Sequence, residues 1–396
     1  MKTQRPLYLC FILIFGIVSP CKAQLDTHKI DRIIASYMTE KNIPGMVVGI
    51  VQGDVLSWSN AYGWADIKNK KPMQTDALMN IASISKTITA TAIMQLWEQG
   101  NLDLDTDINT YLSISIRNPH HPEVPITIRH LLTHTSSIID GSAYQDSYAC
   151  GDPNISLQQW ITQYLTEEGE FYNSEENFLP KEPGTQHEYS NVGYGLLGFI
   201  VEEITNMPFN QYCREQIFEP LGMKYTGWHI NEIDSAKHTI PHIYVNQENR
   251  QMIVEQYSEF FPGEKEFAIG TNIPLCLYSF PNYPDGLLRT NVEELSYFLR
   301  AMMNEEVFNN HPLLKKSTID EMLSFQVEGN ANQGLCWRRS DFESLWGHSG
   351  GDPGVRTHMY FSRETDVGII IFQNNNEGDQ FEILKEIYKV ATEDLK

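Results

Sequence analysis

Two residues near position 85 have the types and spacing of an activated serine. Ser83 precedes Lys86 by three positions, at the start of an apolar run, Ile84–Trp97, that predicts an amphipathic helix. Because positions i and i+3 lie on one helix face, the hydroxyl and the amine should be neighbours. A desolvated lysine can take the proton of a serine, which is otherwise a poor nucleophile. The spacing alone is not specific, because a capping serine followed by a solvated lysine has the same pattern.

A second segment carries groups that could assist this serine. A Pro-Gly turn leads to Tyr189-Ser190-Asn191, and an apolar, helix-like run follows. The phenol of Tyr189 can share a proton with a lysine, because an ammonium stabilises the ionised tyrosine. Asn191 has both an amide donor and an amide acceptor, which makes it a candidate for binding substrate.

The third segment, residues 346–351, reads Trp-Gly-His-Ser-Gly-Gly, and strand-like sequence follows. The two glycines after Ser349 would let an extended substrate approach the strand edge. The same letters fit the nucleophile elbow of α/β-hydrolases. That elbow needs a helix after the serine, whereas Pro353 and an extended run follow here, so the elbow is disfavoured.

Together the three motifs resemble those of the serine β-lactamase and penicillin-binding-protein superfamily, in its class C-like branch with DD-peptidase, D-aminopeptidase and esterase relatives. The resemblance runs from about Ile30 to about Asn375, with supporting segments at Ile43–Gly49, Ile126–Ser136 and Gly286–Thr290. It implies that Ser83 is the acylated nucleophile and that Lys86 and Tyr189 transfer its proton. It also implies a substrate-binding set of Asn191, His348, Ser349, Gly350 and Gly351. The amides of Ser83 and Gly351 would then form the oxyanion hole.

His348 is the main departure from the family pattern, because β-lactamases carry a lysine at this position. A histidine with an ordinary pKa of about 6.5 changes charge near neutrality, whereas a lysine stays charged. If His348 binds a substrate carboxylate, this binding should weaken as the pH rises through the histidine pKa. The substitution therefore argues against true β-lactamase activity.

The rest of the pattern predicts an α+β fold. Strands are expected at Met46–Val51, Val55–Ala61, Leu345–Gly350, Val355–Phe361 and Val367–Phe372, with terminal helices at Asp26–Lys41 and Asp379–Lys396. We expect an antiparallel sheet of about five strands flanked by helices, with a largely helical subdomain inserted at roughly 83–280, as in the β-lactamase/transpeptidase fold. Residues 24–396 are expected to form this single domain. The polar and aromatic segment Ile138–Lys181 is either a lid or a surface insertion.

The N-terminal residues resemble a secretion signal. Lys2 and Arg5 precede an apolar stretch, and small residues allow cleavage after Ala23. We therefore expect a signal peptide at residues 1–23 and a periplasmic or secreted protein. A lipoprotein signal at Cys21 is the alternative. Because the stretch is short for a membrane span, we expect no transmembrane anchor after cleavage.

Charge and metal-like spacings narrow the choice of partners. The formal net charge of −22 disfavours nucleic acid and anionic membranes. His130 and His134 have the i, i+4 spacing of a metal pair but lack the glutamate of the zincin motif, so a helix packed beside the site is favoured. The sequence implies no metal and no organic cofactor.

The remaining cysteines leave the disulfide state open. Four lie after the signal-like segment: Cys150, Cys213, Cys276 and Cys336. Export permits disulfides, and four cysteines allow three pairings, but buried free thiols fit the sequence equally well.

The sequence thus predicts an exported serine hydrolase that acts through an acyl-enzyme. Its expected substrates are peptides ending in a D-residue or small esters, with β-lactams as possible acylating ligands. Two alternatives stay open. One is a true class C-like β-lactamase, and the other is a catalytically silent protein that binds penicillin or cell-wall peptides.

Overall fold

A computed structural model describes residues 25–256, 258–261, 267–304, 307–308, 311–330 and 332–393. The expected signal peptide at residues 1–23, and the alternative signal at Cys21, lie outside the described residues. Within these ranges, no helix combines the length and apolar character needed to cross a membrane.

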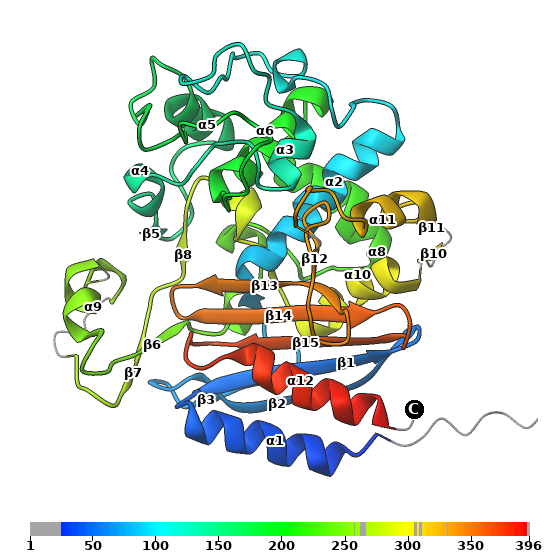
Figure 1. The fold of residues 1–396 in the computed structure, drawn as a ribbon. Helices are drawn as coiled ribbons and strands as arrows, with labels where there is room; N and C mark the ends of the chain where they lie inside the picture. Colours follow the sequence, from blue (N-terminus) through cyan, green and yellow to red (C-terminus); the bar gives the residue numbers. More distant parts are fainter. Residues whose placement is uncertain are drawn as a thin grey trace, which may run out of the picture.

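The centre of the fold is a seven-stranded antiparallel sheet in which strands from the early and the late part of the chain form two adjacent blocks (Figure 1). Its order is β12-β13-β14-β15-β1-β2-β3, so β1 pairs with β15 in the interior of the sheet. The strands are β1 (Gly45–Gln52), β2 (Val55–Asp66), β3 (Lys71–Pro72), β12 (Arg338–Arg339), β13 (Trp346–Asp352), β14 (Val355–Ser362) and β15 (Val367–Gln373). The five long strands, β1, β2, β13, β14 and β15, lie where the sequence predicted strands, which confirms that part of the expected fold. The two edge strands, β3 and β12, have two residues each and are too short to leave a periodic pattern.

Strand β15 contributes side chains to two apolar cores, one on each face of the sheet. All of its residues are buried. Ile369 and Ile371 belong to one apolar cluster, whereas Ile370 and Phe372 belong to a second, larger one. Because successive side chains point to opposite faces of a sheet, an uninterrupted apolar run is what a strand covered on both faces requires.

The outer face of the sheet is covered by helices from opposite ends of the chain, α1 (Thr27–Glu40) and α12 (Gln380–Ala391), which lie side by side (Figure 1). The carboxylate of Asp26 caps α1 by accepting a first-turn backbone N–H at 2.9 Å, and Asp379 caps α12 in the same way. Ile30 and Ile34 of α1 face the sheet at helical spacing. Both helices were predicted, with bounds slightly too long.

A largely helical region covers the opposite face, with α2 at its centre (Figure 1). The remaining helices are α2 (Ser85–Glu98), α3 (Ile128–Leu132), α4 (Ser142–Gln145), α5 (Leu157–Leu165), α6 (Asn191–Thr205), α7 (Phe209–Cys213), α8 (Glu219–Leu221), α9 (Arg250–Gln256), α10 (Val292–Asn304) and α11 (Lys316–Met322). Short paired strands join them: β4 (Met79–Asn80) with β9 (Arg289–Thr290), β5 (Ala149–Cys150) with β8 (Tyr278–Ser279), β6 (His242–Tyr244) with β7 (Asn272–Pro274), and β10 (Val307–Phe308) with β11 (His311–Pro312).

Helix α2 is not amphipathic, and that prediction was wrong. Its polar residues Thr87, Thr89 and Thr91 are buried together with its apolar ones. Each threonine hydroxyl donates to a backbone carbonyl at 2.6–2.8 Å, which removes the cost of burying it. A helix buried on all sides is characteristic of the centre of a large core.

A disulfide ties the segment Ile138–Lys181 to the rest of the helical region. It joins Cys150 of β5 to Cys276, one of the pairings that the sequence left open. Cys213 and Cys336 are buried free thiols. Tyr144 and Trp160 of this segment are part of the core, so the segment is packed against the helices that surround the site.

We predict that Ile371→Ala lowers the free energy of unfolding by about 2–5 kcal/mol, because it leaves a cavity in the centre of the sheet. The matched control is Val55→Ala at a side chain that is 46% exposed, which should change stability by about 0.5 kcal/mol or less. Urea unfolding of both variants checks this. Equal destabilisation would contradict the assignment of β15 to the core.

Candidate active site

The turn that carries Ser83 is held in an uncommon conformation by the sheet. Ser83 lies in a 3-10 turn, Ala82–Ile84, that leads directly into α2. Ala82 has a φ of +47°, which side-chain-bearing residues seldom adopt. The Asn80 side chain accepts the N–H of Ala82 at 2.8 Å and donates to Asp352 of β13 at 3.0 Å. A chain of hydrogen bonds thus connects β13 to the serine turn.

The amine of Lys86 lies at the centre of the site and is fully buried. Its Nζ is 3.1 Å from Ser83 Oγ, 2.7 Å from Asn191 Oδ1 and 2.8 Å from the backbone carbonyl of Asp285. The carboxylate of Asp285 is 3.9 Å away. The structure therefore brings Ser83 and Lys86 together, as their spacing predicted.

The surroundings of Lys86 favour the ammonium. An ammonium has three hydrogens to donate, and three oxygen atoms lie within hydrogen-bond distance of Nζ. Burial acts to lower the pKa of Lys86, but Tyr189 and Asp285 outweigh burial, so the pKa is raised. Burial alone therefore does not make this lysine neutral, and its role as the acceptor of the Ser83 proton stays a prediction.

Tyr189 lies beside the amine. The centroid of its ring is 5.0 Å from Lys86 Nζ, and the ring stacks on His134 at 4.2 Å. Burial raises the pKa of Tyr189, against the opposing effects of Lys86 and of a hydrogen bond with Ser83. The tyrosine is therefore a phenol at rest.

His134 supports this tyrosine by packing. Burial, followed by the charge of Lys86, lowers the pKa of His134 well below its usual value. Its Nδ1 accepts the N–H of Ser190 at 3.1 Å. Nowhere in the described part of the chain do three or more His, Cys, Asp or Glu side chains form a group that could hold a metal.

Asn191 positions Lys86. Its Oδ1 accepts from the lysine, and its Nδ2 donates to Asp140 at 2.9 Å. The same carboxylate accepts the backbone N–H groups of Asn191 and Val192 at the start of α6. The orientation of the amide is thereby fixed, and a direct contact of Asn191 with substrate stays a prediction.

Strand β13 forms the wall opposite α2. A Cβ on Gly350 would lie 2.4 Å from the carbonyl oxygen of Ile81, so this glycine makes room for the serine turn. A Cβ on Gly351 would meet nothing within 4 Å, which leaves open space beside the backbone. Strand β12 pairs with β13 only at residues 346–347, so β12 does not cover the edge from His348 onward.

His348 points into the site as a neutral imidazole. Its Nδ1 is 2.6 Å from the Ser349 carbonyl and donates to it, while Nε2 is buried without a partner. Burial, and then Lys86, lowers the pKa of His348 to about 3. Without a bound substrate, His348 is therefore neutral near pH 6.5, and its binding of a substrate carboxylate stays a prediction.

Ser349 is exposed on β13, opposite His358 of β14 in the register. Strand follows it rather than helix. This geometry excludes the nucleophile elbow and leaves Ser83 as the serine with a lysine beside it. Substrate binding by Ser349 stays a prediction.

A cavity of about 430 Å³ opens above Ser83. It is lined by Ser83, Tyr189, Asn332, Arg338, Arg339, Ser340, Asp341, His348, Ser349, Gly351 and Tyr360. Arg338 brings a positive charge to this cavity, and after burial and Lys86 this charge also acts to lower the pKa of His348. The sequence analysis missed Arg338. Its signal was a pair of adjacent arginines shortly before the His-Ser-Gly motif, in a chain that is strongly acidic.

The sequence analysis also missed the two carboxylates around Lys86. Asp285 directly precedes the supporting segment Gly286–Thr290, and a single acid in that apolar stretch was the available signal. Asp140 lies in the segment whose role was open, and nothing in its sequence context indicated that it reaches Asn191.

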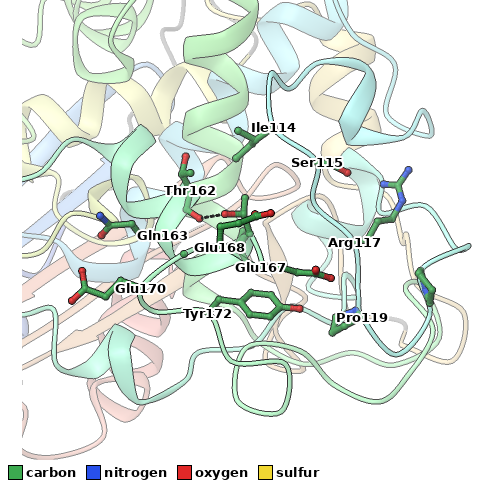
Figure 2. Close-up of a pocket in the computed structure, with 14 residues that line it drawn as sticks. Ile114, Ser115, Arg117, Pro119, Thr162, Gln163, Glu167, Glu168, Glu170 and Tyr172 are labelled. Atoms are coloured by element: carbon green, nitrogen blue, oxygen red, sulfur yellow. Dashed lines mark hydrogen bonds between the residues drawn. The ribbon is translucent and has the colours of Figure 1, made fainter.

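A separate hollow of about 910 Å³ shares no residue with this site (Figure 2). Glu167, Glu168, Glu170, Arg117 and Tyr172 are among the residues that line it. None of the predicted site residues lies there.

Comparison with known proteins identifies the family. The family described as Beta-lactamase matches residues 30–392, and the chain belongs to this family. Curated relatives include protein flp of Staphylococcus aureus, 24% identical over 88% of this chain, and penicillin-binding protein 4* of Bacillus subtilis, 27% identical over 85%. The chain spans 63% of the length of the former and 69% of the latter.

A solved structure confirms the fold. D-amino acid amidase from Ochrobactrum anthropi SV3, complexed with L-phenylalanine, superposes with a TM-score of 0.74 at 23% identity. The match covers 93% of this chain and 100% of that one. The family match and this fold confirm the resemblance to the β-lactamase superfamily that the three motifs indicated, and the relatives are consistent with its class C-like branch.

We predict that Gly350→Ala lowers the free energy of unfolding by about 1–3 kcal/mol, because the added methyl overlaps the Ile81 carbonyl. Gly351→Ala is the matched control on the same strand and should change stability by about 0.5 kcal/mol or less. Thermal unfolding compares them. Equal midpoints would show that β13 does not press against the serine turn.

Proposed function

We propose that the protein is an exported serine hydrolase that works through an acyl-enzyme on peptides ending in a D-residue or on small esters. The observation that carries this proposal is the 3.1 Å contact between Ser83 Oγ and the buried amine of Lys86, with Tyr189 beside both. Membership of the beta-lactamase family supports it.

In the proposed reaction, Lys86 and Tyr189 act as one proton-transfer pair. Acylation proceeds from the form of the pair that has lost one proton. Ser83 Oγ attacks the substrate carbonyl carbon, its proton passes to the pair, and the carbonyl electron pair moves onto oxygen. When the intermediate collapses, the bond to the leaving group breaks and the pair returns the proton to that group. Water then attacks the acyl-enzyme and releases the acid.

The backbone N–H groups of Ser83 and Gly351 are proposed to stabilise the oxyanion. Both residues line the same cavity, and Gly350 allows β13 to approach the serine turn closely. Backbone donors held by a helix start and a sheet strand are fixed before the reaction, which is how an oxyanion hole lowers a barrier.

The carboxylate of a peptide substrate is proposed to bind Arg338. His348 is neutral and cannot supply the positive charge that a lysine provides in β-lactamases. Arg338 lines the cavity with Ser83 and presents a planar set of donors that matches a carboxylate. The similarity to a D-amino acid amidase supports a D-residue beside the scissile bond as the proposed substrate feature.

Export is part of the proposal. The signal-like residues 1–23 support it, and so does the Cys150–Cys276 disulfide, because such bonds persist mainly in oxidising compartments.

We predict that Ser83→Ala abolishes covalent labelling by a fluorophosphonate, because the acylated oxygen is removed. Ser349→Ala should retain labelling. Intact-protein and peptide mass spectrometry locate the label. A label on Ser349 would overturn the assignment. No label on a folded wild-type protein, by either a fluorophosphonate or a fluorescent penicillin, would favour a silent binding protein. Rapid turnover of the penicillin would favour a β-lactamase.

We predict that Arg338→Gln lowers kcat/KM about ten- to hundredfold for a peptide with a free terminal carboxylate, because a charged hydrogen bond is lost. A neutral ester should be hydrolysed at nearly the wild-type rate. The matched control is Arg339→Gln: Arg339 lines the same cavity, but the carbon of its guanidinium lies 5.6 Å from the ring centroid of Phe325, so this variant should lose much less activity on the peptide than Arg338→Gln. Equal losses for both substrates would exclude Arg338 as the carboxylate site.

A further inference from the structure

Asp285 places a buried carboxylate against the amine of the active site. The side chain is 2% exposed, and one of its oxygens, Oδ1, is 3.9 Å from Lys86 Nζ. The other, Oδ2, accepts hydrogen bonds from the hydroxyl of Tyr144 at 3.0 Å and from Nδ2 of Asn282 at 2.5 Å. The two oxygens thus have separate partners: neutral donors on one side and a cation on the other.

Burying a carboxylate is costly unless a charge and hydrogen bonds compensate for it. The two donors on Oδ2 fix the orientation of the carboxylate, and this orientation directs Oδ1 toward Lys86. The backbone carbonyl of Asp285 also accepts from the same amine at 2.8 Å. One residue therefore contacts the amine through both its backbone and its charge.

We propose that Asp285 is a positioning residue that holds the Lys86–Tyr189 pair in its fully protonated form and thereby sets the pH range in which Ser83 is acylated. This inference rests on the proposed function of Ser83 and deepens it. It assigns Asp285 no contact with substrate.

Other ionisable groups face Asp285 from every element packed around it. They are Lys86 of α2, Asp140 before α4, Tyr144 of α4, Tyr148 after α4, Tyr189 before α6 and Asp352 of β13. Burial raises the pKa of Asp285 to about 7 and that of Asp352 to about 6, and it also raises the pKa of Asp140. Lys86 is the one cation in this set, so each carboxylate that ionises favours its ammonium further.

The direction of the effect follows from the sign of the charges. A carboxylate near Lys86 stabilises the ammonium and raises its pKa. The same carboxylate opposes ionisation of the Tyr189 phenol and raises the pKa of that group as well. Because acylation requires the pair to lose one proton, the ionised Asp285 moves the acidic limb of kcat/KM to higher pH, whichever member of the pair gives up the proton.

The test variant is Asp285→Asn, which removes the charge with little change in shape. Its amide oxygen can occupy the position of Oδ2 and keep the bonds from Tyr144 and Asn282. We expect the acidic limb of kcat/KM for a neutral ester to move to lower pH by about one unit or more. At a pH below the acidic limbs of both proteins, kcat/KM expressed as a fraction of its own plateau should then be about tenfold higher in the variant than in the wild type.

The control variant is Tyr144→Phe, which removes one hydrogen bond to the carboxylate and keeps the ionisable carboxyl group beside Lys86. Its plateau can fall, but the midpoint of its acidic limb should move much less than that of Asp285→Asn. If Asp285→Asn also changes only the plateau, or shifts the limb to higher pH, the residue is merely structural and the proposal is overturned.

A second measurement separates this inference from the proposed function. Lysine labelled with ¹³C at Cε reports the titration of each amine by NMR, and Lys86→Arg identifies the signal of Lys86. In Asp285→Asn the Lys86 signal should titrate at lower pH than in the wild type. If wild-type Ser83 is not acylated but this shift occurs, the proposed function fails and the charge control by Asp285 stands. An unmoved Lys86 signal in the folded variant overturns the inference itself.

Discussion

The burial of one amine determines the arrangement of the site. Lys86 lies in the first turn of a helix that is covered on all sides, where an isolated ammonium would be strongly destabilised. The structure compensates with oxygen atoms from different parts of the chain, on Ser83, Asn191 and Asp285. Moving any of these segments would leave a buried charge without its partners. The contacts that stabilise the buried ammonium of Lys86 therefore also hold Ser83 at hydrogen-bond distance from it.

The acceptors around Lys86 are themselves held by the segment Ile138–Lys181. Asp140 orients the amide of Asn191, and Tyr144 bonds to the carboxylate of Asp285. The disulfide at Cys150 fastens this segment close to β8. The segment that the sequence left as either a lid or a surface insertion thus holds the groups that contact Lys86. Such support is how a rigid scaffold keeps reactive groups in place.

The sequence was most informative where periodicity or short spacing carries the signal. The five long strands and the Ser83–Lys86 pair follow from local patterns, and the structure places them as expected. Charge states did not follow from local patterns. The ammonium of Lys86 and the neutral ring of His348 depend on burial and on residues far away in the chain, such as Asp285 and Arg338. The disulfide pairing depended on tertiary contacts in the same way.

Strands β1 and β15 are neighbours in the interior of the sheet although they come from opposite ends of the chain. A ribosome delivers β1 long before β15, so the edge of β1 that pairs with β15 stays open until β15 emerges. Strand β13, whose Gly350 lies against the serine turn, also emerges long after α2. Pairing over such distances slows folding. From the emergence of α2 until that of β13, a nascent chain therefore holds Ser83 and Lys86 without the strand that forms one wall of the cavity above them.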